Sequence, residues 1–458
     1  MKKETLKTII LTLLIFSSVI LSAQLLLNNS AWTSEYSLWA LFQGEKDNKK
    51  EAVDINDTGA LSSVFSPSSF LLTFDDGRLY YSATQEEGKN LRVSFNEALK
   101  KAFQNNQAAT VNEQEWQSAL QKPGIYANYY VPISADAMSA FLGNTNHSAT
   151  SGSSFDQIVI CFDLVTSGGT VYFRDSDANK QLRVQIDNTS SLLSAFSKYE
   201  AVQKQGYAYA FELNLDKKMA DSAVQQNVLL DSYVLLPLEP MTMNVIRSET
   251  MTISDTATDG ILPLFGHNPK IARKFTDNSG NHLFVNQEST LTINPETGLI
   301  EYSAEDGYGI ELDGDGSLSS NATGCGKLLD DLFKLFEMDP NVTLFINTPL
   351  TDTSKTDYTI SFDYLFDGNR IIRDNNSCEI QIKAGKIVHF KANIRNYTFV
   401  RTTEQKHAIE ILDHLYITQA QDMLTVNELY TGYVDKGGEI PLTWKAGIHG
   451  SPEIITVE

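Results

Sequence analysis

Hydrophobic residues are most concentrated in an uncharged run near the N-terminus, Thr8–Leu27. The run has about 20 residues, which as an α-helix span the roughly 30 Å hydrocarbon core of a bilayer. A cleaved secretory signal is the alternative. Its cleavage site would be Leu21, Ser22 and Ala23, which places a bulky leucine where a small residue is required, and the apolar run continues past it. We therefore predict that residues 1–28 are a short tail and a retained, single-pass transmembrane anchor.

Three lysines set the predicted orientation of this anchor. Lys2, Lys3 and Lys7 precede the apolar run, and positive residues beside a membrane helix stay in the cytoplasm. We expect a cytoplasmic N-terminus in the cell membrane and an extracytoplasmic body. Residues 29–60 contain the polar stretch EKDNKKEAVDINDTGA and are predicted to be a juxtamembrane linker.

From residue 61 onward, strand-like and helix-like periods follow one another. FLLTFDDGRLYYSA predicts a β-hairpin with its turn at Asp76 and Gly77. SFNEALKKAFQ and NEQEWQSALQK have apolar residues at helical spacing, with Ser94 and Asn112 as predicted N-caps. FDQIVICFDLV, GTVYFRD and QLRVQI predict strands, and SLLSAFSKY predicts a short helix. We predict an N-terminal α+β domain at residues 61–155 and a middle strand-rich domain at 156–250.

The polar stretch RSETMTISDTATDG predicts the main domain boundary, before a C-terminal α+β domain at residues 251–458. HLFVNQESTLTINPETGLIEYSA predicts three strands, and GKLLDDLFKLFEM predicts an amphipathic helix. DYTISFDYLFDGNRII and CEIQIKAGKIVHFKANI predict more strands, before a helix TEQKHAIEILDHL and a hairpin ELYTGYVDKGGEIPLTWKAGI. The predicted fold class is α+β, with an N-terminal transmembrane helix followed by extracytoplasmic domains of antiparallel sheets covered by helices.

The charge of the chain restricts its partners. Asp and Glu number 57 against 36 Lys and Arg, a formal net charge of −21. Nucleic-acid binding requires a basic face, so no nucleic-acid partner is expected. Anionic lipid headgroups are also expected to repel the body, which leaves membrane attachment to the anchor. A hydrophobic content of 42% indicates a folded chain.

Three cysteines, Cys161, Cys325 and Cys378, are too few for a disulfide framework. So few cysteines in an exported chain fit a Gram-positive bacterial surface. Cys161 lies in the apolar stretch QIVICFDLV, which predicts a buried, inert thiol. The sequence does not decide whether Cys325 and Cys378 form a single disulfide bridge.

Motifs for metal binding and catalysis are incomplete. The stretches that begin at Asp175 and Asp313 open like calcium loops but lack the glycine and the bidentate glutamate, so both are predicted to be turns. His407 and His414 share a predicted helix without metal-site spacing. No nucleophile elbow and no phosphate-binding loop occurs. We predict no catalytic, cofactor-binding or metal-ligating residues, no cofactor and no enzymatic activity. The sequence does not decide whether two carboxylates form a catalytic pair, because their proximity depends on the fold.

The layout of a basic tail, one membrane helix and strand-rich exported domains resembles the YycH family. The resemblance lies in ETLKTIILTLLIFSSVILS, in LFGHNPKIARKFTDNSGNHLFVNQESTLTINPETGLIEYSA, and in the C-terminal strands from YLFDGNRII to PLTWKAGI. The C-terminal half also resembles the shorter relative YycI. Family members are membrane-anchored accessory proteins of the cell-wall sensor histidine kinase WalK, also called YycG, in low-GC Gram-positive bacteria. The resemblance implies a two-component system regulator whose partners are this kinase and a YycI-like relative.

The predicted membrane helix carries a candidate partner-binding face. Ser18 and Ser22 are four residues apart and share a face, with Ser17 beside them and Gln24 near the outer end. Small and polar residues mediate helix packing in lipid. The alternative is that the serines bond to carbonyl groups of their own helix. A second function also stays open, that of an exported cell-wall polymer binding protein or hydrolase for which the helix is a simple tether.

Overall fold

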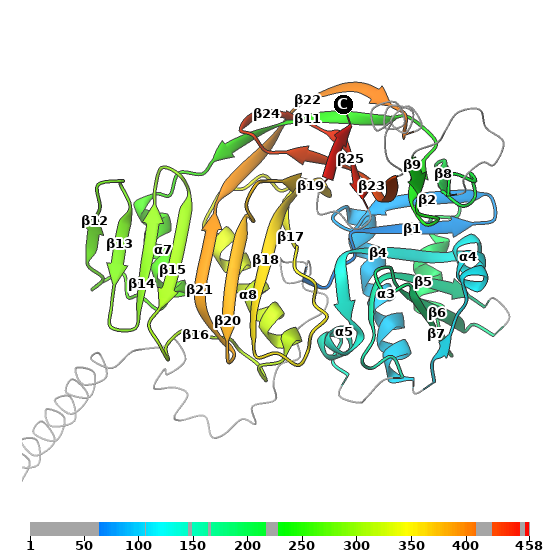
Figure 1. Ribbon diagram of the computed structural model, residues 1–458, viewed down its shortest axis with the longest axis horizontal. Coiled ribbons are helices and arrows are strands. Elements are labelled where there is room, and N and C mark those ends of the chain that lie inside the picture. The colour runs from blue at the N-terminus through cyan, green and yellow to red at the C-terminus, as the bar shows by residue number, and fades with distance from the viewer. Residues whose placement is uncertain are drawn as a thin grey trace, which may run out of the picture. The chain divides into compact units, whose positions relative to one another are not determined.

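The computed structural model describes residues 64–105, 107–144, 149–163, 166–216, 228–408, 424–448 and 454–457. The chain divides into two compact units, Met1–Asp54 and Ile55–Glu458, and every described residue belongs to the second. The helices of this part are α3 (Glu86–Gln104), α4 (Glu113–Gln121), α5 (Ala135–Phe141), α6 (Ser190–Ser197), α7 (Asp255–Leu264) and α8 (Leu318–Phe333). Figure 1 shows them against antiparallel sheets.

A seven-stranded sheet with the order β2-β1-β4-β5-β6-β7-β3 forms the N-terminal part of this unit (Figure 1). Side chains alternate between the two faces of a strand. Phe70 and Ile158 therefore lie in the core on the side of α3, α5 and α6, whereas Leu71 and Val159 lie with Trp116 of α4. Both faces are buried, which explains the nearly continuous apolar runs in the sequence. The strands are β1 (Ser69–Phe74), β2 (Gly77–Ser82), β3 (Ala109–Thr110), β4 (Gly124–Ser134), β5 (Ser154–Phe162), β6 (Gly169–Asp175) and β7 (Lys180–Ile186).

A fourteen-stranded sheet follows, with the main order β12-β13-β14-β15-β21-β20-β18-β19-β23-β25-β26. Its pairs are antiparallel, except that β23 runs parallel to β19 and to β9. The strands of the main order are β12 (Lys274–Thr276), β13 (His282–Val285), β14 (Ser289–Asn294), β15 (Leu299–Ala304), β18 (Asp357–Phe366), β19 (Asn369–Ile372), β20 (Cys378–Lys383), β21 (Lys386–Asn393), β23 (Leu424–Val434), β25 (Thr443–Ile448) and β26 (Ile454–Val457). Three further strands pair with members of this order: β9 (Val228–Leu230) with β23, β16 (Ile310–Glu311) with β21, and β17 (Val342–Ile346) with β18.

Helices α7 and α8 cover the same face of this large sheet. The ring of Phe265, just after α7, lies 5.4 Å from that of Tyr302 and 4.9 Å from that of Phe390, centroid to centroid. The ring of Phe333 in α8 lies 6.0 Å from that of Tyr364. Because cross-strand partners share a face, the registers place these aromatic residues on one side and leave a largely polar face opposite.

A three-stranded sheet has β11 (Met241–Thr250) between β22 (Arg395–Lys406) and β24 (Gly438–Pro441). Asp435, just before β24, is buried and lies with its Oδ2 3.2 Å from Arg395 Nε and 3.5 Å from Arg373 Nε. The hydroxyl of Tyr397 donates to the same oxygen at 2.9 Å. These bonds hold β22 against the β23–β24 connection. A further pair of strands, β8 (Tyr207–Tyr209) and β10 (Leu235–Pro237), lies beside the seven-stranded sheet.

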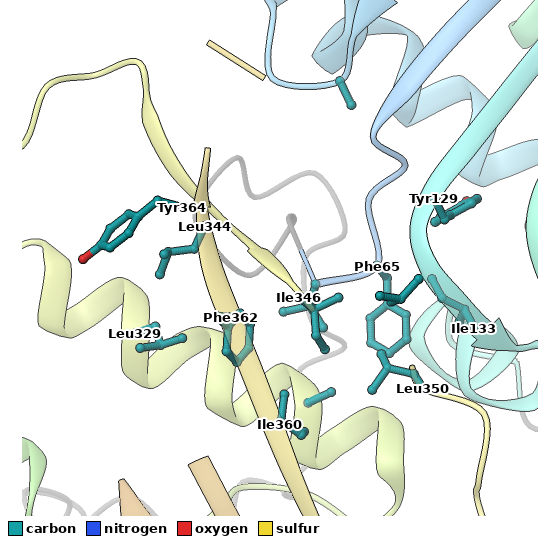
Figure 2. Packing of buried hydrophobic residues seen from close by; sticks show 14 of the residues in the cluster. Phe65, Tyr129, Ile133, Leu329, Leu344, Ile346, Leu350, Ile360, Phe362 and Tyr364 are labelled. Carbon is teal, nitrogen blue, oxygen red and sulfur yellow. The ribbon is translucent and has the colours of Figure 1, made fainter. Parts of the chain in front are cut away.

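The two large sheets share one hydrophobic core, and Figure 2 shows the place where they meet. Phe65 and Leu350 lie between Ile133 of β4 and Ile346 of β17. The backbone N–H of Ser134 donates to the carbonyl of Leu350 at 2.7 Å, and the N–H of Leu350 donates to the carbonyl of Pro132 at 2.9 Å. Segments more than 200 residues apart in sequence are therefore joined by burial and by backbone hydrogen bonds.

Most of the locally encoded elements are confirmed. The hairpin β1–β2 forms as predicted, but its turn is Asp75 and Asp76 rather than Asp76 and Gly77, because Gly77 is opposite Phe74 and begins β2. Asn112 caps α4, because its side chain accepts a hydrogen bond from the N–H of Glu115. The α+β class with mostly antiparallel sheets is also confirmed.

Three element predictions are wrong in detail. Ser94 is no N-cap, because α3 begins at Glu86 and Ser94 lies inside it. Helix α8 begins at Leu318, eight residues before the predicted start, with Ser317 as its N-cap. Residues 403–406, predicted to open a helix, are the end of strand β22, which pairs with β11.

Other predictions concern residues that the structure does not describe or boundaries that it leaves open. Residues 1–28 and 29–60 lie outside the described part, and so does His414. No helix among the described residues is both long and apolar enough to cross a membrane. The seven-stranded sheet runs across the predicted boundary between 61–155 and 156–250, and β11 pairs with strands of 251–458. The domain division itself stays a prediction.

Candidate functional site

The residues predicted to act in the membrane belong to the part of the chain outside the described ranges. The partner-binding residues among them are Ser17, Ser18, Ser22 and Gln24, and the orientation residues are Lys2, Lys3 and Lys7. Their roles stay predictions.

A serine and a histidine meet beneath the large sheet. The Oγ of Ser289 lies 3.2 Å from Nε2 of His267, a distance at which a histidine activates a serine. Both side chains are buried, with exposed fractions of 3% and 5%, and burial lowers the pKa of His267. A substrate cannot reach this pair. Its hydrogen bond, together with that from Ser289 Oγ to Asn286 Oδ1 at 3.2 Å, instead fixes the turn before β14.

A second such pair lies on the polar face of the large sheet. The Oγ of Ser303 lies 3.2 Å from Nδ1 of His389, across β15 and β21. Ser303 is exposed, but catalysis also requires donors that stabilise the charge of the transition state and a cavity that holds the substrate. The cavity found in the described part of the chain is lined by neither residue. We assign the pair to cross-strand stabilisation of the sheet.

All three cysteines are free and buried. Burial raises the pKa of Cys161 to about 12 and raises those of Cys325 and Cys378 as well. The Sγ of Cys161 donates to the carbonyl of Ala119 at 3.4 Å. The predicted buried thiol is confirmed, and the structure has no bridge between Cys325 and Cys378. A thiol with a raised pKa is a poor nucleophile at neutral pH.

The carboxylates of the two acidic stretches are occupied by protein groups: besides bonds within the loops, Asp175 Oδ2 accepts from Ser154 Oγ, and Asp313 pairs with Lys327. Asp175 Oδ1 accepts from the N–H of Ala178 at 2.8 Å. Asp315 Oδ1 accepts from the N–H of Ser317 at 3.0 Å and from Ser320 Oγ at 2.9 Å, and these bonds lower its pKa to about 2. Within the described ranges, no three His, Cys, Asp or Glu side chains gather as a metal site would require.

A shallow cavity of about 470 Å³ lies at the end of β18 and β20, beside the loop that carries Leu350. Its floor is apolar, with Leu350, Ile360 and Ile382. At its rim Lys355 Nζ lies 3.1 Å from Asp352 Oδ2, so these two charges satisfy each other. The cavity has room for an apolar side chain of a partner but contains no arrangement for bond cleavage.

An arginine-centred cluster joins the two large sheets. Arg370 of β19 donates from Nη2 to Glu428 Oε1 at 2.6 Å and from Nη1 to Oε2 at 3.3 Å. Its guanidinium lies 4.5 Å from the ring centroid of Tyr430 and 5.2 Å from that of Tyr130 in β4. We call these four residues the Arg370 cluster. The hydroxyl of Tyr130 also donates to the carbonyl of Gly368 at 3.4 Å, so the cluster fixes the seven-stranded sheet to the large one.

The outer edge of the large sheet carries the clearest candidate interaction surface. We call residues 268–285, with strands β12 and β13, the outer hairpin; Figure 1 shows it at the end of the sheet. Ile271, Phe275 and Val285 have exposed fractions of 76%, 56% and 54%. Exposed apolar side chains that gather in one place mark surfaces that meet a partner or a membrane.

Neither the Arg370 cluster nor the outer hairpin is predicted as a site from the sequence. The signal for the cluster is a charged residue directly before the apolar pair Ile371 and Ile372, but its partner Glu428 lies 58 residues away. The signal for the hairpin is the stretch PKIARKF, which mixes three cations with apolar residues in an acidic chain.

The described body is thus an α+β protein of helix-covered antiparallel sheets, with exposed apolar residues in the outer hairpin at one edge of the large sheet. Comparison of the sequence with known families finds no match, and comparison with curated proteins finds no relative. The fold is similar to the crystal structure of YycH from Bacillus subtilis, with a TM-score of 0.56 and 15% sequence identity. The alignment covers 87% of this chain and 97% of YycH. The chain therefore has a YycH-like fold.

Proposed function

We propose that this chain is a membrane-anchored extracytoplasmic accessory protein that regulates a cell-wall two-component sensor histidine kinase of the WalK/YycG type. The observation that carries the proposal is the YycH-like fold, which extends over 87% of the chain. The family resemblance of the anchor sequence supports the same function.

The residues of the described body favour binding over catalysis. Ser289 and His267 are buried, and Ser303 and His389 lie on a sheet face rather than in the cavity. We therefore propose no enzymatic activity. Regulation by binding requires only that the chain contact two states of the kinase with different affinities.

The proposed contacts are of two kinds. In the membrane, Ser17, Ser18, Ser22 and Gln24 would pack against helices of the kinase or of a YycI-like relative. Outside the membrane, the polar and apolar surfaces of the sheets would contact the extracellular part of the same complex. Lys2, Lys3 and Lys7 would keep the tail in the cytoplasm.

The membrane contact is tested by replacing Ser18 and Ser22 together with leucine in the full-length chain. Each interhelical hydrogen bond contributes on the order of 0.6–2 kcal/mol, and leucine also blocks close approach of the helices. We expect weaker co-purification with the kinase and altered kinase output. Leu11→Ile with Leu25→Ile is the matched control and should leave both unchanged. Equal association of the serine variant and the control would assign the contact to another face or to the exported body.

A further inference from the structure

The outer hairpin has one apolar face that no described element covers. Phe275 is opposite Leu283 in the β12–β13 pair, and Val285 is two residues further along β13, so these side chains share a face. Leu283 is in turn opposite Thr292, which belongs to the polar face of the large sheet. Helix α7 covers the other face, where Phe284 is buried. The apolar part of the open face is thus confined to the outermost two strands.

Positive charge accompanies these apolar residues. Residues 268–276 contain Lys270, Arg273 and Lys274 and no acid, in a chain of net charge −21. All three cations are exposed. The neighbouring Asp277 is held in the hairpin turn, where it accepts from the N–H groups of Ser279 and Asn281 at 2.8 and 2.9 Å.

The charges also decide which partner fits the edge. A second copy would bring its own basic edge against this one, and lysine or arginine on an edge strand disfavours strand pairing. Apolar side chains flanked by long cations suit a bilayer surface, where the apolar groups enter the interface and the cations reach the headgroups. Asp255 Oδ1 lies 3.4 Å from Lys274 Nζ and offsets that charge, so the net positive charge of this edge comes from Lys270 and Arg273. More distant acids of the body act weakly here, because physiological salt screens charges beyond about 8 Å.

We propose that the outer hairpin docks on an anionic lipid bilayer, through Ile271, Phe275 and Val285 in the interface and Lys270 and Arg273 at the headgroups. The proposal rests on the proposed membrane location of the chain and revises the expectation that the anchor alone contacts lipid. Between Leu27, the end of the predicted anchor, and Val64 lie 36 residues, which span at most about 120 Å when extended. The linker is therefore long enough to let this edge reach the bilayer.

A dye at the hairpin turn tests the proposal. Asn278→Cys places a thiol at an exposed turn position, while the native Cys161, Cys325 and Cys378 are buried, so a thiol-reactive dye labels the new site selectively. The full-length chain is inserted into nanodiscs of phosphatidylcholine alone or with phosphatidylglycerol, each with nitroxide-labelled lipid. We expect the nitroxide lipids to quench the dye in the nanodiscs that contain phosphatidylglycerol, and we expect this quenching to disappear at high salt. Asp177→Cys, in the β6–β7 turn, is the matched control position and should show no such quenching.

Two variants identify the groups that act. Lys270→Glu with Arg273→Glu should lower the docked population roughly tenfold or more, because each cation contributes strongly near an anionic surface. Ile271→Ser with Phe275→Ser should abolish quenching while the chain stays in the nanodisc. Equal quenching in both lipids, no quenching in either, or dye self-quenching between two chains would each overturn the proposal. Failure of the chain to enter nanodiscs would instead count against its proposed membrane location.

Discussion

At the scale of single residues, the Arg370 cluster is the contact between the two large sheets whose contribution to stability a single substitution tests most directly. The side chain of Arg370 is 19% exposed and that of Glu428 is 39% exposed. Arg370 is the more buried member of the pair, so its removal loses two charge-assisted hydrogen bonds and a packed guanidinium, while water hydrates the partly exposed Glu428 carboxylate. The stacked rings of Tyr130 and Tyr430 lose their cation at the same time.

Arg370→Ala should lower the free energy of unfolding by about 1–3 kcal/mol, measured by denaturant unfolding of the full-length chain. Arg370→Lys should fall between this variant and the native chain, because lysine keeps the charge but loses the bidentate geometry. Arg401→Ala is the control: Arg401 pairs with Glu439 but is 56% exposed, so its loss should cost about 0–1 kcal/mol. Equal effects at Arg370 and Arg401 would contradict the assigned role.

Asp156 gives a prediction for pH. Burial raises its pKa from 3.8 to about 6, although Ser176 donates to it from its N–H at 2.9 Å. The folded chain thus binds a proton more tightly than the unfolded chain, so this group favours folding below about pH 4 and loses that contribution as pH rises through about 6. Asp156→Asn should remove this dependence and raise the free energy of unfolding at pH 7 by on the order of 1–3 kcal/mol. A variant whose stability follows the native pH profile in parallel would refute the raised pKa.

At the scale of elements, the two predicted helix N-caps have different outcomes. Asn112 caps α4 as predicted, whereas Ser94 lies inside α3. Asn112→Ala should cost about 1 kcal/mol of unfolding free energy. Ser94→Ala should be neutral or slightly stabilising, since alanine is the better helix former. Both are measured by the same unfolding experiment, and a larger loss from Ser94→Ala than from Asn112→Ala would mean that the helix starts are misplaced.

Local hairpins could be predicted because turn residues and alternation lie within a few positions of each other. The β1–β2 and β14–β15 pairs are of this kind. The end of strand β22 could not be predicted, because its last residues, Thr403–Lys406, have a polar composition typical of a helix. They form a strand because they pair with β11, about 160 residues earlier in the chain. The start of α8 was also missed, because Gly324 interrupts the helical pattern. A Cβ at that glycine would lie 2.9 Å from Cδ2 of Leu312, so a larger residue there would displace the end of the Leu312 side chain.

The candidate surfaces show the same division between local and distant information. The basic and apolar residues of the outer hairpin are visible in the sequence, but only the register of β12 and β13 shows that Phe275, Leu283 and Val285 share an uncovered face. Glu428 and Arg370 come together only in the folded sheet.

At the scale of the whole molecule, the described body is one compact unit in which the two large sheets share a core. The backbone bonds at Leu350 and the contact between Arg370 and the Tyr130 ring both join the two sheets. The shared core and these bonds couple the two sheets to each other. Such a body suits an accessory protein that changes the balance between two states of a kinase.

The proposed function makes this chain a regulator of a WalK/YycG-type kinase and gives its predicted membrane helix a part in that regulation. The most direct measurement is the autophosphorylation rate of that kinase in nanodiscs, alone, with the full-length chain, and with a chain whose residues 8–27 are replaced by an unrelated membrane helix. We predict a severalfold change in rate with the native chain, because a few kcal/mol of differential packing shifts a two-state kinase strongly, and loss of that change after the exchange. An unchanged rate with the native chain would contradict regulation, and an equal change with both chains would show that the helix is only a tether.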